Sequence, residues 1–258
     1  MTLPEGRLGY AWEFERHSML ENRGVDHAEL YARFRDALPR LDITSDPTGV
    51  FDILDQSTQG ACQGHALAGV FGGCYWLETG RKIQFSRAAA YYLSQKRDGI
   101  VGDRGSTLSG GQWVATTHGL CLESDWPYPS RYNPNEPPGI AYAYKLAATK
   151  PMRTSKEVFE WIDLGLPVQI GLLWGNSADQ EIVRAWRPEG GGHSTFFWMR
   201  SKAGNIKNLN SWGKRWNGDG VHEWTEASID AAIKHRYTVM IGYGPAGMAF
   251  PKPTPVGG

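Results

Sequence analysis

The sequence has neither an excess of charge of one sign nor a long apolar run. Lys plus Arg and Asp plus Glu both total 27 in 258 residues. A balanced chain lacks the basic surface that attracts nucleic acid or an anionic membrane, so neither partner is expected. No apolar run approaches the ~20 residues that span a bilayer. The first residues lack the basic stretch and apolar core of a secretory leader, which favours a cytoplasmic location.

Cysteine is also scarce. The three cysteines, Cys62, Cys74 and Cys121, cannot all pair, and their spacing fits neither a disulfide framework nor a zinc site. At least one thiol is therefore free. No metal or other cofactor is expected.

The surroundings of Cys62 are informative. A polar loop, 55–61, ends at this cysteine, and apolar residues then recur every three or four positions as far as Gly80. This period predicts a helix that buries one face, with Gly80 just past its C-terminus. Cys62 would lie in the first turn, where unpaired N–H groups and the helix dipole favour a thiolate. A cysteine among Ala, Leu and Val can equally be a small buried hydrophobe, so this stretch alone leaves both interpretations open.

A proline-rich stretch, 133–139, divides the rest of the chain. Helical patterns are concentrated before it and strand patterns after it, which predicts an α+β protein with a cleft between two halves. Helices are expected at 26–38, 86–95, 108–118, 141–148 and 155–164, and strands at 41–43, 168–173, 195–199, 206–209, 221–224 and 237–243. The expected units are an N-terminal extension or short pro-segment (1–40), a helical lobe (41–140), a β-rich lobe (141–244) and a loose tail (245–258).

Two short motifs in the second half complete a constellation. His193 follows Gly191 and Gly192 at the entry to an apolar, strand-like run, and Asn210 begins the run Asn-Ser-Trp-Gly. Taken singly, each is more typical of a turn or a satisfied core residue. Together with Cys62 they supply a nucleophile, a base and an orienting amide.

With these motifs the chain resembles the papain-like cysteine peptidases, bacterial and viral members in particular. Cys62 and His193 are 131 residues apart, within the ~130–150 typical of this family. The resemblance extends from about Leu41 to about Gly244. It implies a two-lobed fold with a helical left lobe, a β-barrel-like right lobe and the active site between them. It also implies thiol-dependent hydrolysis of peptide bonds in protein or peptide substrates.

The resemblance assigns a role to each matching residue. Cys62 is the nucleophile, His193 the acid and base, Asn210 the group that orients the histidine, and Trp212 the shield over their hydrogen bond. The Gln56 amide and the Cys62 backbone N–H form the oxyanion hole. The residues expected at the substrate site are Gly105, Ser106 and Gly192, through their backbone, the shielding Trp212, and Leu108 and Ser194 in the main specificity pocket.

A second alignment of the polar loop remains open. Aligning Gln59 with the family's glutamine places His65 at the nucleophile position and makes the protein a non-catalytic binding module. Gln56 lies six residues before Cys62, just as Gln59 lies six before His65, so spacing does not decide. The complete Cys–His–Asn set favours Cys62. An amidase or acyltransferase using the same three residues is a further alternative.

The chain departs from the family in two respects. Secreted members pair a cysteine just ahead of the nucleophile with one near the Gly-Gly loop, and both are absent here. Cys74 and Cys121 are therefore expected to be free and buried. Residues 1–40 are too few for the long inhibitory pro-region.

Overall fold

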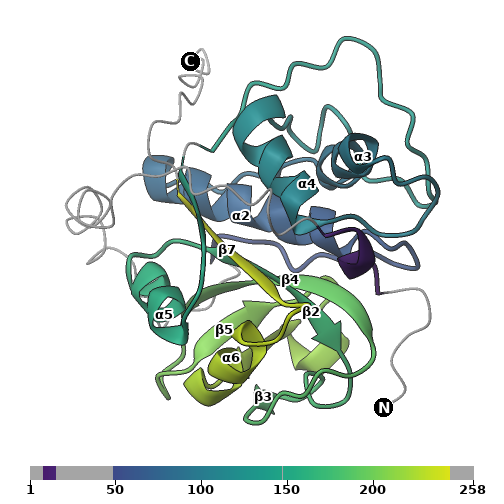
Figure 1. Ribbon diagram of the computed structural model, residues 1–258. Coiled ribbons are helices and arrows are strands. Elements are labelled where there is room, and N and C mark those ends of the chain that lie inside the picture. The colour runs from purple at the N-terminus through teal and green to yellow at the C-terminus, as the bar shows by residue number, and fades with distance from the viewer. Residues whose placement is uncertain (1–7, 16–48, 147, 245–258) are drawn as a thin grey trace.

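The computed structural model describes residues 8–15, 49–146 and 148–244, and these form a helical lobe and a β lobe (Figure 1). The first lobe contains α2 (Cys62–Thr79), α3 (Arg87–Asp98), α4 (Leu108–Trp113) and the π-helical turn η5 (Val114–His118). The second contains β1 (Ala148–Pro151), α5 (Ser155–Asp163), β2 (Val168–Trp174), β3 (Ile182–Val183), β4 (Gly191–Arg200), β5 (Ile206–Leu209), η6 (Trp216–Gly218), β6 (Val221–Trp224), α6 (Glu226–Ile233) and β7 (Val239–Gly244). A short turn, η1 (Trp12–Phe14), precedes both.

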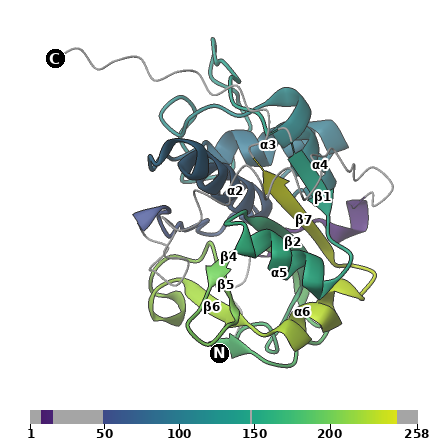
Figure 2. The same cartoon turned by 90° about the vertical axis from the view of Figure 1, so that its left-hand side faces the viewer.

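Helix α2 is the central element. It begins at Cys62 and ends at Gly80, whose φ of 66° allows its N–H to reach the Trp76 carbonyl at 2.7 Å. Every residue from Cys62 to Tyr75 is buried, so more than the one face indicated by the apolar period is covered. The helix lies between the other helices of its lobe and the sheet (Figure 2). Glycine makes this possible, because a Cβ on Gly69 would lie 2.4 Å from the Phe196 ring.

The β lobe is one seven-stranded sheet in the order β1-β7-β2-β4-β5-β6-β3. All pairs are antiparallel except β3 with β6. One face packs on α2 and its neighbours, and the other on α5 and α6. The expected barrel is not closed: β1 and the two-residue β3 lie at opposite edges of the sheet, and no pairing joins them in the described part of the chain.

One helix expected from the sequence is wrong. Residues 141–146 are not helical, and Leu120 and Tyr144 exchange backbone hydrogen bonds of 2.8 and 3.2 Å. Pairing with a distant segment has outweighed the helical propensity of the Ala and Tyr residues there. Strand β4 also begins four residues earlier than expected, so that His193 lies within it.

The helix caps follow local chemistry. Ser86, the first residue of the helix expected at 86–95, caps α3 by accepting the Ala89 N–H at 3.0 Å. Helix α5 is capped by Thr154, the residue before the helix expected at 155–164, because Thr154 and Glu157 form a reciprocal capping box. The helix expected at 26–38 and the strand at 41–43 lie outside the described residues. No described helix has both the length and the apolar composition to cross a membrane.

Candidate active site

Cys62 is the first residue of α2, and its side chain is fully buried. Burial raises the pKa of the thiol to about 12. Backbone N–H groups of Ser194, Gly9 and Gln63 act in the opposite direction, since they point at the sulfur and favour a thiolate. The sulfur therefore lies in a nest of donors that would stabilise its anion once water could reach it.

His193 and Asn210 are brought together by the pairing of β4 with β5. The His193 Nε2 lies 2.8 Å from the Asn210 Oδ1. Because an amide oxygen only accepts, Nε2 carries the proton and Nδ1 presents a lone pair. Nδ1 has no hydrogen-bond partner among the described residues, and burial lowers the pKa of His193 to about 3. The histidine is thus neutral and held in the tautomer that suits a base.

Two indole rings flank this histidine. Trp212 lies 4.6 Å from the His193 ring at an interplanar angle of 31°, and Trp174 lies 4.8 Å away at 83°. Both tryptophans are buried, which keeps water from the His193–Asn210 bond. Trp212 was expected in this place and Trp174 was not. Trp174 directly follows the strand expected at 168–173, and the pairing of β2 with β4 places it opposite Gly191.

Gln56 joins the two lobes beside Asn210. Its N–H donates to the Ser211 carbonyl at 2.8 Å, and the Ser211 hydroxyl donates to its side-chain Oε1 at 2.6 Å. The Gln56 Nε2 donates to the Gln59 carbonyl at 2.7 Å. One hydrogen of this NH₂ group is thereby directed into the loop, and the amide is held next to the His193–Asn210 pair.

Gln59 and His65 belong to the interior of the helical lobe. The Gln59 amide donates to the Pro129 carbonyl at 2.7 Å and accepts from the Tyr92 hydroxyl at 3.2 Å. The His65 Nδ1 lies 2.9 Å from the Ala61 carbonyl, and its ring packs edge-on against Tyr128. Burial lowers the pKa of His65 to about 3. Each side chain thus has partners in the helical lobe.

The chain's own N-terminal residues lie between the lobes. We call Leu8–Glu15 the cleft segment; it is the purple stretch in Figure 1. Tyr10 N–H donates to the Gly192 carbonyl, Ala11 N–H to the Ser106 carbonyl, and Ser106 N–H to the Gly9 carbonyl, each at 3.0 Å. The segment is therefore bound backbone to backbone by both lobes at once.

The fit of the cleft segment depends on glycine. A Cβ on Gly9 would lie 1.9 Å from the Gly60 carbonyl oxygen, one on Gly105 would lie 2.1 Å from the Gly9 oxygen, and one on Gly192 would lie 2.0 Å from the Tyr10 oxygen. Side chains at these positions would exclude an extended backbone. The residues expected to bind substrate through their main chain, Gly105, Ser106 and Gly192, are thus brought together around a peptide.

Side chains anchor the cleft segment as well. Tyr10 is buried beside Leu108 and Gly171, and a Cβ on Gly171 would lie 2.7 Å from Leu108 and 2.9 Å from the Tyr10 ring. The Glu15 carboxylate accepts the N–H groups of Leu108 and Ser109 at 2.8 and 3.0 Å. The expected specificity pocket at Leu108 is therefore filled by a tyrosine of the same chain.

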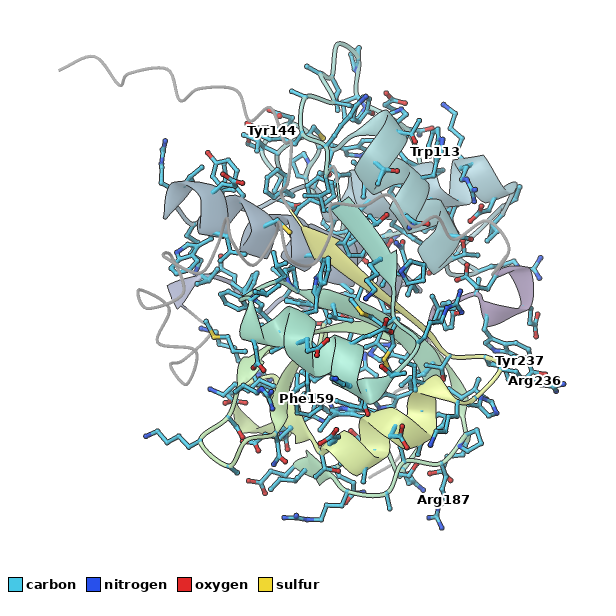
Figure 3. The ribbon with its side chains drawn as sticks, turned by 60° about the vertical axis from the view of Figure 1, so that its left-hand side comes forward. Trp113, Tyr144, Phe159, Arg187, Arg236 and Tyr237 are labelled. Carbon is cyan, nitrogen blue, oxygen red and sulfur yellow. The ribbon has the colours of Figure 1, made fainter. Side chains whose placement is uncertain are left out.

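The far wall of the cleft segment comes from the turn before β7. Trp12 packs on Tyr237, with ring centroids 4.3 Å apart. Tyr237 and Arg236 are labelled in Figure 3 on the side of the molecule where the purple segment lies. The Arg236 guanidinium lies 4.4 Å from the centre of the Tyr237 ring. The segment is thus held at Trp12 and Glu15 as well as by the backbone contacts near Gly9.

No family model matches this chain, and no curated protein matches it in sequence. Solved structures do match it. Xylellain, a cysteine protease from Xylella fastidiosa, is 20% identical over 95% of this chain and 98% of that chain, with a TM-score of 0.65. The fold is that of the papain-like cysteine proteases.

Two further structures agree with this fold. The proform of the ragweed pollen allergen Amb a 11, a cysteine protease, is 16% identical over 76% of this chain and 62% of that chain, with a TM-score of 0.61. A structure from a study of the mite allergens Blo t 1 and Der p 1 is 17% identical over 75% of this chain and 67% of that chain, with a TM-score of 0.56. At these identities the likeness concerns the fold, so the chemistry must be argued from this chain's own residues.

Proposed function

We propose that this protein is a papain-like cysteine peptidase whose substrates are extended peptides. The observation that carries the proposal is the cleft segment itself. A stretch of ordinary polypeptide is held by main-chain hydrogen bonds to Ser106 and Gly192 beside the buried sulfur of Cys62. A slot that binds one extended backbone through main-chain groups can bind another.

The proposed chemistry begins at Cys62 and His193. The Nδ1 lone pair of His193 takes the thiol proton, and the thiolate attacks the carbonyl carbon of a bound peptide. The negative charge that develops on the carbonyl oxygen is stabilised by the Cys62 N–H and the Gln56 amide. The histidine then protonates the leaving amine, and water attacks the thioester to release the acid and restore the thiol.

The cleft segment is proposed to be an occupant of this slot and not a substrate. Within the cleft segment, the group that acts on the pKa of the Cys62 thiol is the backbone N–H of Gly9. A nucleophile needs a carbonyl carbon at ~3–3.5 Å along its line of attack, and an N–H group offers none. The described form is therefore a latent one, and activity requires that residues 8–15 leave the cleft.

The test uses the full-length chain with the cleft segment displaced. Gly9→Val places a branched side chain where a Cβ alone would lie 1.9 Å from the Gly60 oxygen. We expect this variant to cleave a fluorogenic peptide library, and a thiol-directed epoxide to abolish cleavage and modify Cys62, as read by mass spectrometry. Hydrolysis of simple amides without cleavage of any peptide would favour an amidase. Binding of peptides without turnover, with Cys62 unmodified, would favour a binding module.

A further inference from the structure

The carboxylate of Asp103 joins two loops that border the slot. Its Oδ1 accepts the Gly60 N–H at 2.8 Å and the Tyr91 hydroxyl at 2.7 Å. Gly60 belongs to the nucleophile loop (55–61), which ends just before Cys62. Asp103 belongs to the substrate loop (99–106), which carries the backbone that pairs with the cleft segment. One oxygen atom thus links both loops to α3.

Tyr91 and Gln95 of α3 extend this link. The Tyr91 hydroxyl accepts the Gly105 N–H at 3.3 Å and the Gln95 amide at 3.1 Å. The same Gln95 Nε2 lies 2.9 and 2.7 Å from the carbonyls of Gly102 and Gly105, so its two hydrogens are shared among three acceptors. Both side chains are buried, and burial together with Asp103 raises the pKa of Tyr91, so the phenol keeps its proton and donates. The substrate loop is therefore fastened to a rigid helix.

No covalent bond shares this task. Cys62, Cys74 and Cys121 are all free, so no disulfide joins the nucleophile loop to the substrate loop. The two loops nevertheless approach closely: a Cβ on Gly60 would lie 3.1 Å from the Gly105 nitrogen and 3.5 Å from the Gly9 Cα. The space between them holds one extended backbone.

We propose that Asp103 is a positioning residue that sets the separation of the nucleophile loop and the substrate loop. It acts through Gly60 on the position of the nucleophile loop, and through Tyr91 on the backbone that aligns the peptide. The inference rests on the proposed peptidase function, since it concerns how a bound carbonyl is aligned with the sulfur. Hydrogen bonds to a carboxylate are stronger than neutral ones, which suits a single side chain to this role.

The predicted signature is a separation of two rates. A misplacement of ~1 Å at a reacting centre can lower a rate by ~10²-fold, because the near-attack geometry is lost. Asp103→Ala should therefore lower kcat/KM for a peptide at least tenfold. Alkylation of Cys62 by iodoacetamide needs no substrate alignment and should change by less than about twofold. A change that only weakened the fold would not separate the two rates.

The experiment is carried out in the full-length Gly9→Val chain. Asp103→Ala is compared with Asp103→Asn, whose amide oxygen can accept both hydrogen bonds and should retain most of the parent kcat/KM. Asp125→Ala is the matched control: this exposed aspartate accepts the Leu122 N–H within its own turn and contacts neither loop. Tyr91→Phe, which removes the donor to Asp103, replaces Asp103→Ala if the latter does not fold.

A second measurement does not depend on turnover. Hydrogen exchange of peptides covering 55–62 and 99–106 should become faster in Asp103→Ala and stay unchanged in Asp125→Ala. Faster exchange in a chain that cleaves no peptide would contradict the peptidase proposal but support the role of Asp103 in holding the two loops together. Unchanged exchange with unchanged kcat/KM would overturn the role of Asp103. So would a parallel loss of cleavage and alkylation, or an Asp103→Asn variant as impaired as Asp103→Ala.

Discussion

Replacing Gly9 by valine tests the central structural feature, the occupied cleft. The new Cβ would lie 1.9 Å from the Gly60 oxygen, and helical-lobe backbone cannot retreat there without moving the nucleophile loop. The cleft segment should instead leave the slot. We expect the rate at which iodoacetamide labels Cys62 to rise by about 10²–10³-fold. The unfolding transition should stay cooperative, with a melting temperature lower by about 8–16 °C, because the folded state loses the contacts of the cleft segment.

The magnitude follows from the contacts that Gly9→Val removes. The hydrogen bonds from Ser106 N–H to the Gly9 oxygen and from Tyr10 N–H to the Gly192 oxygen contribute ~1 kcal/mol each. Burial of the Tyr10 side chain contributes ~2 kcal/mol. A total of ~4 kcal/mol corresponds to a factor of ~10³ in the ratio of closed to open forms. In the native chain Cys62 should label slowly, because it is fully buried and its pKa is raised to about 12.

The assay is the pseudo-first-order labelling rate at mildly acidic pH, with the modified residue identified by mass spectrometry. Cys74 and Cys121 are buried and serve as internal references for global opening. Gly49→Val is the matched control, because a Cβ on Gly49 meets no atom within 4 Å. Native-like labelling of Cys62 in Gly9→Val, with an intact melting transition, would refute the assignment of the cleft segment as the barrier. Equal acceleration at all three cysteines would show unfolding instead.

Of three further predictions, the first two are tested in the full-length Gly9→Val chain. His193→Ala should reduce kcat/KM as much as removal of the thiol, and Asn210→Ala clearly less, because Asn210 only orients the base; equal losses at both would contradict this division. Gln56→Ala should lower kcat/KM by ~10²–10³ with little change in KM. Gln59→Ala should lower stability by ~1–3 kcal/mol and kcat/KM only a few-fold, because both ends of its amide are hydrogen-bonded inside the helical lobe. A larger loss of kcat/KM in Gln59→Ala than in Gln56→Ala would favour the second alignment, with His65 at the nucleophile position. Finally, burial lowers the pKa of His65 and His193 to about 3 and that of His222 to about 4, below the unfolded value of ~6.5. The unfolded chain therefore binds more protons, and the free energy of unfolding should fall as pH drops from ~6.5 toward 4. The loss should be on the order of 1.4 kcal/mol per pH unit for each histidine, and urea unfolding with equal free energies at pH 7 and pH 5 would exclude it.

The sequence predicted the features that depend on local chemistry. The beginning of α2 at Cys62, its end at Gly80 and the Ser86 cap each follow from a few neighbouring residues, and each is confirmed. The meeting of His193 with Asn210 followed from a family motif, and the pairing of β4 with β5 brings them to 2.8 Å. The motif does not depend on where the strands begin, so the misplaced start of β4 did not affect the expected pairing of these two residues.

Features made by distant backbone pairing could not be predicted. The segment 141–146 has helix-forming residues, but its carbonyl and N–H groups pair with Leu120. The cleft segment is bound by main-chain groups of Ser106 and Gly192, about 95 and 180 positions away, and main-chain hydrogen bonds have no side-chain signature. Only the glycines at 9, 105 and 192 record that approach, and glycine alone has many simpler explanations.

The cleft segment is covalently part of the molecule that it occupies. Its closure is a unimolecular event, so the closed fraction is independent of protein concentration, and dilution does not open the cleft. A free peptide that competes for the slot must exceed the effective concentration that the covalent connection gives the segment. A single backbone cut between residues 15 and 49 would convert the same contacts into a bimolecular complex, and dilution would then release the segment.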